Sequence, residues 1–307
     1  MEFEKAIVIR DKTRLEQLIE RFNSKAQARF YIESSGGDFE QYETEHHTFY
    51  ESLKTVQHVI SKSFKSKVID RSFLPTYMFS DSELIIVIGQ DGLVANTAKY
   101  VGKLPLVGIN PDSSQYDGVL LPFNPSDLTK VIHDLITDRH EIKAVTLAEA
   151  KLQDGQRLLG FNDFYIGASS HISSRYLITY NGENENQSSS GIIVSTGAGS
   201  TGWLSSIFNM AYNVHKFAEK EERNIRAKLN WGDEKLIFVV REPFLSKVTQ
   251  IGIGYGVITA NKKLKIESKM PTGGVIFSDG IESDFLNFNS GSVVEIGIAR
   301  EKAHLAV

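Results

Sequence analysis

The chain has 307 residues, of which 41% are hydrophobic and 23% charged, and its net charge is −4. This composition is typical of a globular protein long enough for two hydrophobic cores. It excludes a fibrous or disordered chain and a general attraction to nucleic acid or an anionic membrane, while the absence of cysteine excludes disulfides and thiolate nucleophiles and fits a reducing compartment. No apolar run approaches membrane-spanning length, and a strand is expected at residues 6–9, too early for a signal peptide, so we expect a cytoplasmic protein.

Strands and helices alternate over the first half of the sequence. The hydrophobic pattern predicts a strand at 6–9, a helix at 13–22, a short strand at 28–32, a surface loop at 34–41, a helix at 44–63, strands at 67–69 and 84–88, a helix at 93–101, a strand at 106–109 and a helix at 125–138. Asn124 and Pro125 are typical of the cap and first position of that last helix. Such alternation is typical of a parallel sheet covered by helices, so we expect an α/β nucleotide-binding domain over residues 1–141.

Short strands of alternating polarity follow in the second half. They are expected at 157–166, 175–180, 236–240, 257–266 and 293–299, and Asn-Gly and Asp-Gly pairs mark turns. A helix after Gly202 is the one long exception. We therefore expect a mainly antiparallel, β-rich domain over residues 142–307.

The strand at 84–88 runs into Gly89-Gln90-Asp91-Gly92 and then into a helix. A side chain at such a turn lies outside the carboxyl end of its strand, where ligands of α/β proteins bind. Asp91 is therefore a candidate ligand-binding or catalytic residue. The alternative is that Asp91 caps the helix that starts near Leu93, and both roles can hold together.

Asn162 and Asp163 interrupt an otherwise apolar strand. An amide can donate and accept as an adenine edge demands, and a carboxylate can accept two ribose hydroxyls, so the pair is a candidate nucleotide site. The alternative is a hairpin turn, for which Asn-Asp is a common pair. Asp279-Gly280 is predicted to be a hairpin turn, and His46-His47 lack companions at a metal-ligand spacing, so no metal site is expected.

A second glycine turn lies in the segment 192–206, IIVSTGAGSTGWLSS, at Gly197, Gly199 and Gly202. Glycines let the main chain approach closely and turn sharply, so that backbone N–H groups and the start of the following helix can hold a phosphate. The alternative is a flexible Gly/Ser connection between two strands. The ordinary dinucleotide-binding topology is disfavoured, because a charged stretch at 216–224 stands where a second strand with an acidic end is needed.

These segments occur in the order found in NAD kinases, and the chain resembles that family from about residue 45 to its end. The matching segments are the GQDG turn, Gly108-Ile109-Asn110, Asn162-Asp163, the glycine turn with the Ser-Ser-Gly before it, and the Ser-Asp-Gly at 278–280. Asn110-Pro111-Asp112 and Arg241-Glu242-Pro243 are similar to the mitochondrial-type branch. The resemblance departs at Gln90, where the family has a second glycine, and at Ser190, where many members have aspartate.

The resemblance implies an α/β domain followed by a β-rich, sandwich-like domain in a homo-oligomer, a dimer or tetramer. It implies transfer of the γ-phosphoryl group of ATP to the 2′-hydroxyl of the adenosine ribose of NAD, with Mg²⁺ held largely by ATP. The alternatives are a non-catalytic dinucleotide-binding protein and a kinase for another hydroxyl acceptor.

Individual roles follow from the same resemblance. Asp91 matches the residue that accepts the hydroxyl proton, and Asn162 and Asp163 match the pair that contacts the dinucleotide. The other matching positions are Gly89 and Gly92 in the donor turn, Thr196, Gly197, Gly199 and Ser200 in the loop beside the NAD pocket, and Thr201, Gly202, Trp203 and Ser206 lining it.

Overall fold

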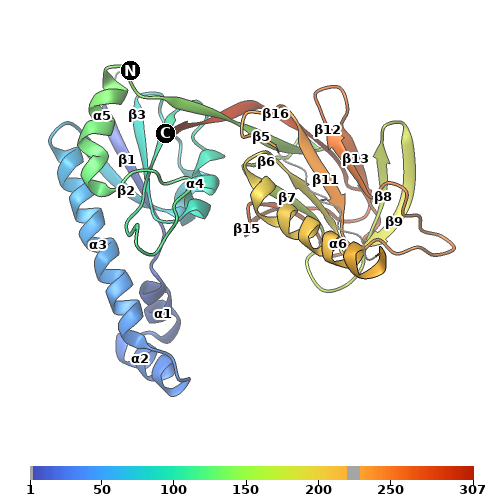
Figure 1. The fold of residues 1–307 in the computed structure, drawn as a ribbon, viewed down its shortest axis with the longest axis horizontal. Coiled ribbons are helices and arrows are strands. Elements are labelled where there is room, and N and C mark those ends of the chain that lie inside the picture. Colours follow the sequence, from blue (N-terminus) through green and yellow to red (C-terminus); the bar gives the residue numbers. More distant parts are fainter. Residues whose placement is uncertain (1–2, 220–228) are drawn as a thin grey trace. The chain divides into compact units, whose positions relative to one another are not determined.

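The computed structural model describes residues 3–219 and 229–307, which form two compact units (Figure 1). The first unit holds Met1–Lys143 together with His304–Val307, and the second holds Ala144–Ala303. This division differs from the expected domains at the C-terminus, where residues 142–307 were all assigned to the second domain. None of the described helices is long and apolar enough to cross a membrane.

A parallel sheet with the strand order β2-β1-β3-β4 forms the centre of the first unit. Its strands are β1 (Lys5–Arg10), β2 (Lys65–Asp70), β3 (Glu83–Ile88) and β4 (Pro105–Ile109). Residues 84–88 of β3 are fully buried, as a parallel strand covered on both faces requires, and the expected parallel sheet is confirmed. The last strand, β16 (Val293–Ala306), ends by pairing His304 and Leu305 with β4, and for this reason the C-terminal residues belong to the first unit.

Helices and short 3₁₀ turns connect these strands. They are α1 (Arg14–Phe22), α2 (Lys25–Ser34), α3 (Phe39–Ser61), α4 (Asp91–Ala98) and α5 (Leu128–Ile136), with η1 (Arg71–Thr76) and η2 (Pro125–Asp127). The helix expected at 125–138 is confirmed as η2 continued by α5. In Figure 1, α1 and α2 lie beside the part of α3 that projects beyond the sheet.

The strand expected at 28–32 is wrong, because these residues lie in α2. Ser24 caps this helix by accepting from the Gln27 N–H at 3.2 Å. Ala28 and Ile32, four residues apart, are buried in a small cluster with α1 and α3, whereas Phe30 is 75% exposed. The loop expected at 34–41 is shorter than predicted, because α3 already begins at residue 39.

Two antiparallel sheets form the second unit. One contains β16-β13-β8-β9 and the pair β5-β6, and the other has the order β12-β11-β10-β7-β14-β15. The strands are β5 (Ile142–Leu152), β6 (Arg157–Gly160), β7 (Asp163–Ala168), β8 (Ser174–Tyr180), β9 (Glu183–Ser189), β10 (Ile192–Ser195), β11 (Leu236–Val240), β12 (Tyr255–Ile258), β13 (Leu264–Ser268), β14 (Gly274–Ser278) and β15 (Ile281–Asn287). One buried apolar cluster takes side chains from both sheets, so the unit is sandwich-like, as expected.

Two expected strands are each divided by a corner. The segment 157–166 becomes β6 and β7, and the segment 257–266 becomes β12 and β13, and in both cases the two strands belong to different sheets. Polar residues interrupt each run, Asn162-Asp163 in the first and Asn261-Lys262-Lys263 in the second, but they do not reveal that the chain changes sheet. The helix expected after Gly202 is confirmed as α6 (Trp203–Glu219), and the remainder of the charged stretch, 220–224, lies outside the described residues.

Candidate functional site

The turn between β3 and α4 positions the first group of candidate residues. The helix begins at Asp91, and Gln90 is its N-cap residue with an extended backbone and no side-chain cap bond. Asp91 is therefore not the N-cap, and the alternative role expected for it is wrong. Residues 91 and 92 are the first two helical positions, whose N–H groups have no acceptor within the helix and favour a negatively charged ligand.

The Asp91 carboxylate is fixed through one of its oxygens. Oδ1 accepts a hydrogen bond from the Leu120 N–H at 2.7 Å, and no other hydrogen bond to this carboxylate is formed among the described residues. The segment that carries Leu120 packs on β4, since a Cβ added to Gly108 would lie 2.2 Å from the Leu120 oxygen. Buried Asn110 holds the same segment by donating to the Tyr116 oxygen at 2.9 Å. Asp91 thus has a fixed orientation and a second oxygen available to a substrate.

A cavity of about 300 Å³ lies beside this turn. Gly89, Gln90 and Gly92 line it, and a Cβ added to Gly92 would meet no atom within 4 Å, so a ligand can approach the backbone there. Asp91 is not among the residues that line this cavity, because its side chain turns to Leu120. The rest of the lining includes residues 11–14, which follow β1, and Arg71, which follows β2.

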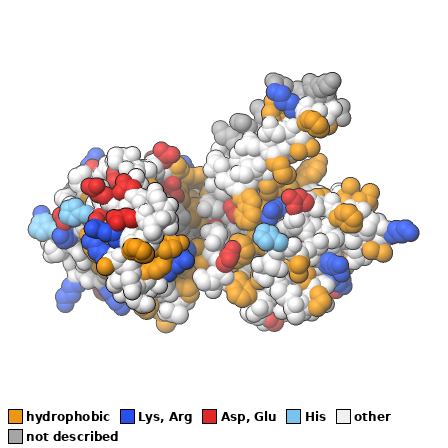
Figure 2. Space-filling model, turned by 90° about the horizontal axis from the view of Figure 1, so that it is seen from below, with side chains coloured by type: hydrophobic (Ala, Val, Ile, Leu, Met, Phe, Trp, Pro, Cys, Tyr) orange, Lys and Arg blue, Asp and Glu red, His pale blue; other side chains and the backbone are white. Residues whose placement is uncertain are grey.

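The basic side chains of this lining form ion pairs that are at least partly exposed. Lys12 contacts Glu20 at 2.6 Å, Arg71 contacts Asp11 at 2.9 Å, and Arg14 contacts Glu45. On the face drawn in Figure 2, Lys and Arg side chains of the first unit lie beside Asp and Glu side chains in this manner. Exposed pairs contribute only about 0–1 kcal/mol each, so a charged ligand can replace them at little cost.

The corner at Asn162 and Asp163 positions the second group of candidate residues, in the second unit. The Asp279 carboxylate accepts hydrogen bonds from the N–H groups of residues 161, 162 and 163 at 3.1, 2.6 and 3.3 Å. Asp279 has a φ of 55° in the turn between β14 and β15, which confirms the hairpin expected at Asp279-Gly280. The hairpin alternative for Asn162-Asp163 is wrong, because β6 and β7 belong to different sheets.

Asp163 is a buried carboxyl group that lacks a protein partner. It is 8% exposed, and burial, together with the charge of Asp279, raises the pKa of Asp163 to about 7. Among the described residues, no side chain or backbone group donates a hydrogen bond to its carboxyl oxygens. Its oxygens are not among the fully buried unpaired atoms of the described residues, so the group is largely desolvated yet open to the hydroxyls of a bound ligand.

The glycine loop after β10 packs directly on this corner. The Thr196 N–H donates to the Asn162 oxygen at 2.9 Å, and the Thr196 hydroxyl donates to the Phe161 oxygen at 2.5 Å. A Cβ added to Gly199 would lie 2.1 Å from the Asn162 oxygen, and one added to Gly197 would lie 1.9 Å from the Asn230 oxygen. These glycines are therefore required by close approach of two backbones.

The loop's own N–H groups are largely used within it. The Gly199 N–H bonds the Thr196 hydroxyl at 3.2 Å, and those of Ser200 and Gly202 bond the oxygens of Gly197 and Gly199 at 3.4 and 3.0 Å. The Ser200 hydroxyl also donates to the Gly197 oxygen, at 2.7 Å. These three amides are thus used within the loop, which fixes Asn162 beside it, and phosphate binding by the loop stays a prediction.

An aromatic cavity of about 1010 Å³ opens where the loop enters α6. The rings of Tyr165 and Trp203 are parallel within 4° with centroids 6.0 Å apart, and Tyr165 also stacks on Phe277 at 5.0 Å. The Arg241 guanidinium lies over Trp203, 5.6 Å from its ring centroid. Among the remaining candidates, Thr201, Gly202 and Ser206 are exposed at the start of α6.

The structure thus brings together Gly89, Asp91 and Gly92 in one unit, and Asn162, Asp163 and the loop from Thr196 to Gly199 in the other. Sequence reasoning missed the contacts of Asp279, although its Ser-Asp-Gly was noticed as a motif. It also missed Arg241 beside Trp203, and the basic residues Lys12, Arg14 and Arg71. Only the fold brings these residues to the cavities, so no local pattern marks them.

The fold is that of solved kinases of nicotinamide dinucleotides. A yeast NADH kinase in complex with NADH matches with a TM-score of 0.63 and 13% identity, over 100% of this chain and 84% of that chain. An NAD kinase from Archaeoglobus fulgidus in complex with ATP matches with a TM-score of 0.56 and 13% identity, over 98% and 93% of the two chains. These likenesses establish the expected fold class.

Among curated proteins, an NAD kinase from Thermomicrobium roseum is 26% identical over 165 residues, which cover 50% of this chain. The match spans 54% of that relative, about half its length. No protein-family model matches the sequence.

Proposed function

We propose that this chain is an NAD kinase, which transfers the γ-phosphoryl group of ATP to the 2′-hydroxyl of the adenosine ribose of NAD and yields NADP. The observation that carries the proposal is the Asp91 carboxylate, which one hydrogen bond orients and whose second oxygen stays available, at the end of a buried central strand of this fold. The fold shared with NAD and NADH kinases and the sequence likeness to an NAD kinase support it.

In this proposal Asp91 accepts the proton of the attacking hydroxyl. The ribose oxygen forms a bond to the γ-phosphorus, and the bond from that phosphorus to the bridging oxygen breaks, so that ADP leaves. Such transfers pass through a loose transition state, in which catalysis is mostly positioning and charge neutralisation. The bond from the Leu120 N–H supplies the positioning, because it leaves Asp91 one orientation toward the substrate.

The acceptor contacts lie at the corner of the second unit. Asn162 offers an amide for the adenine edge, and the unpartnered carboxyl group of Asp163 accepts ribose hydroxyls. Thr196, Gly197, Gly199 and Ser200 support this corner, as their contacts with each other and with Asn162 suggest. The exposed positions Thr201, Gly202 and Ser206, with half-buried Trp203, line the remainder of the NAD site in this proposal.

The donor contacts lie at the turn of the first unit, where the backbone at Gly89 and Gly92 borders the cavity. Mg²⁺ comes with ATP and neutralises charge on the phosphates. Carboxylates of Asp11 and Asp112 line the same cavity, and oxygen ligands of this kind suit Mg²⁺, which keeps several waters and needs few protein ligands. Donor binding is thus assigned to the expected domain 1–141, and NAD binding to the expected domain 142–307.

The proposal includes a homo-oligomer, a dimer or tetramer. Large apolar side chains are exposed along the segment that leads into the edge strand β12, and buried interfaces commonly cover such patches. These side chains are Phe244, Leu245, Val248, Ile251, Tyr255 and Val257, which are 41–79% exposed. Light scattering after size-exclusion chromatography checks the expected mass.

Membership of the mitochondrial-type branch and a cytoplasmic location also stay proposals.

The decisive experiment incubates the purified protein with NAD, ATP and Mg²⁺. An NADP-specific dehydrogenase detects the product. Parallel reactions replace NAD by NADH, or replace ATP by GTP or polyphosphate. We expect one NADP for each ADP formed. A protein that binds NAD but forms no NADP with any of these donors is the non-catalytic dinucleotide-binding protein, and the kinase proposal then fails.

A further inference from the structure

Three basic side chains from two different segments line the cavity beside the 89–92 turn. In the register of the parallel sheet, Arg10 of β1 is level with Asp70 of β2 and Ile88 of β3. The residues that follow these three strands therefore meet at one edge of the sheet. Lys12 and Arg14 arrive there after β1, and Arg71 after β2, beside the turn that follows β3.

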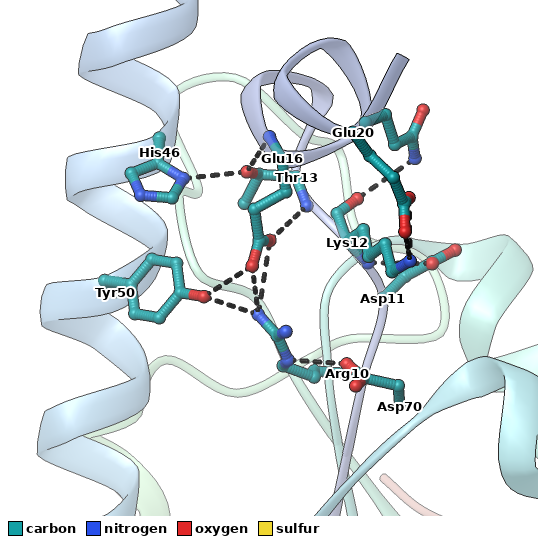
Figure 3. Close-up of polar contacts among 10 residues, drawn as sticks. Arg10, Asp11, Lys12, Thr13, Glu16, Glu20, His46, Tyr50 and Asp70 are labelled. Carbon is teal, nitrogen blue, oxygen red and sulfur yellow. Dashed lines mark hydrogen bonds and ion pairs between the residues drawn. The ribbon is translucent and has the colours of Figure 1, made fainter. Parts of the chain in front are cut away.

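A partly buried network fixes the segment that carries Lys12 and Arg14 (Figure 3). Arg10 contacts the carboxylates of Glu16 at 3.1 Å and Asp70 at 2.7 Å, and the Tyr50 hydroxyl donates to Glu16 at 2.7 Å. The Thr13 N–H donates to Glu16 at 2.8 Å, which completes a capping box at the start of α1. The backbone at residues 10–13 is thus held independently of Lys12 and Arg14.

The cavity cations differ from Arg10 in exposure. The Arg10 side chain is 14% exposed and committed to its partners, whereas those of Lys12, Arg14 and Arg71 are 40, 56 and 32% exposed. Each of the three holds a carboxylate whose side chain is 21–65% exposed, and a polyphosphate offers the same charge-assisted bonds with more negative charge. Two of those carboxylates, Asp11 and Glu45, also line the cavity and would be released toward the Mg²⁺ that accompanies a nucleotide.

The turn itself offers a ligand only part of its backbone. Gln90 places an exposed side chain where the family pattern has glycine, so one approach of a phosphate to the main chain is narrowed. Positive side chains across the lining, Lys12, Arg14 and Arg71, offer contacts to a phosphate that do not depend on the turn. The cavity, about 300 Å³, is at the small end of ligand sites, which suits a phosphate chain better than a whole nucleotide.

We propose that Lys12, Arg14 and Arg71 bind the polyphosphate chain of the donor, so that the cavity selects nucleoside triphosphates over monophosphates. This inference rests on the proposed function, because it assigns the donor to this turn. It adds three phosphate contacts outside the glycine-containing turn, and two of them, Lys12 and Arg14, lie on a segment whose backbone other residues already hold.

The test compares ligand binding by the wild type and the double variant Lys12→Gln/Arg71→Gln. Calorimetric titrations with ATP, inorganic tripolyphosphate, AMP and NAD are made at two salt concentrations. We expect ATP and tripolyphosphate to bind about 10- to 100-fold more weakly to the variant, because two charge-assisted bonds are lost. AMP and NAD affinities stay within about twofold, and the salt dependence of ATP binding decreases.

Lys54→Gln is the matched control. Lys54 forms an exposed pair with Glu51 at 2.7 Å on α3 and is not among the cavity residues, so this variant also loses one surface cation. We expect unchanged binding of all four ligands. Should the double variant not fold, Arg14→Gln removes the third cation while it leaves the other two pairs intact, and the same loss for ATP is expected.

The outcomes separate this inference from the kinase proposal. If the wild type makes NADP and the variants bind ATP as tightly as it does, the phosphate contacts are wrong and the kinase stands. If the wild type makes no NADP but binds ATP and the variants lose that binding, the contacts stand without the kinase. If the wild type binds neither ATP nor tripolyphosphate, both proposals fall.

Discussion

The Asp91 carboxylate uses one oxygen for a hydrogen bond from the Leu120 N–H and leaves the other oxygen without a hydrogen bond to the described residues. The amide in Asp91→Asn can still accept from the Leu120 N–H, so the 118–121 segment should keep its place. It cannot accept a proton from a sugar hydroxyl. We expect turnover to fall by about 10²–10⁴ with an unchanged thermal midpoint and ATP affinity, measured by the coupled assay and by titration. Full turnover in a folded Asp91→Asn protein removes Asp91 from the mechanism.

Asp163 makes the stability of the protein depend on pH. Burial and the neighbouring Asp279 raise the pKa of Asp163 to about 7, above the unfolded value of about 3.9. The folded state therefore holds this proton more tightly than the unfolded state. The stability linked to it is present below pH 4 and is lost as the pH rises toward 7.

Asp163→Asn tests this dependence, because the amide does not titrate. Between pH 5 and pH 8 we expect the free energy of unfolding of the wild type to fall by roughly 1–3 kcal/mol relative to the variant. Urea unfolding at the two pH values measures it. Parallel pH profiles of the two proteins would mean that the carboxyl group ionises without cost in the folded state.

At the scale of elements, the glycine loop is expected to behave as packing. In Gly199→Ala the new methyl group meets the Asn162 oxygen at 2.1 Å, so backbone must shift, and we expect a loss of about 1–3 kcal/mol in the free energy of unfolding. Gly297→Ala is the matched control, since its nearest contact is the flexible Lys263 side chain at 3.7 Å and it lies within the extended strand β16. Chemical denaturation measures the free energy of unfolding of both variants. Equal values for the two would contradict the packing role of Gly199.

The elements that sequence predicts well are those whose burial is uniform. Residues 84–88 are apolar throughout and are buried on both faces, so the strand follows from the run itself. The failures occur where the pattern is shared by two structures. Exposed Phe30 and Tyr31 make α2 resemble a short strand. The polar residues at 162–163 and 261–263 interrupt their runs without showing that the chain passes from one sheet to the other.

At the scale of the whole molecule, sequence order predicts more of the candidate site than any single motif does. The turn with Asp91 and the corner with Asn162 and Asp163 are visible as interruptions of apolar strands. Asp279, which supports that corner, is not visible in the sequence as its partner. It lies 117 residues from Asn162 and reaches it only through the pairing of β7 with β14. Contacts of such separation follow from topology, which a local pattern does not contain.

Asp279 therefore offers the sharpest test of how the two candidate sites divide their work. Asp279→Ala removes a carboxylate that accepts from three successive N–H groups, so the corner at 161–163 loses its support while the first unit is untouched. We expect the KM for NAD to rise about 10- to 100-fold and the KM for ATP to stay within about twofold, because bonds to a charged acceptor contribute about 1.5–3 kcal/mol each.

Asp279→Asn serves as the graded control for that variant. It keeps one acceptor oxygen for the Asn162 N–H and removes the negative charge beside Asp163, so its effect on the KM for NAD should be smaller than that of alanine. Steady-state kinetics, with NAD and ATP varied in turn, supply the KM for each substrate in each of the two variants. A matched rise in both KM values would show that donor and acceptor sites do not act separately, and the assignment of ATP to the turn at 89–92 and of NAD to the corner at 161–163 would then be wrong.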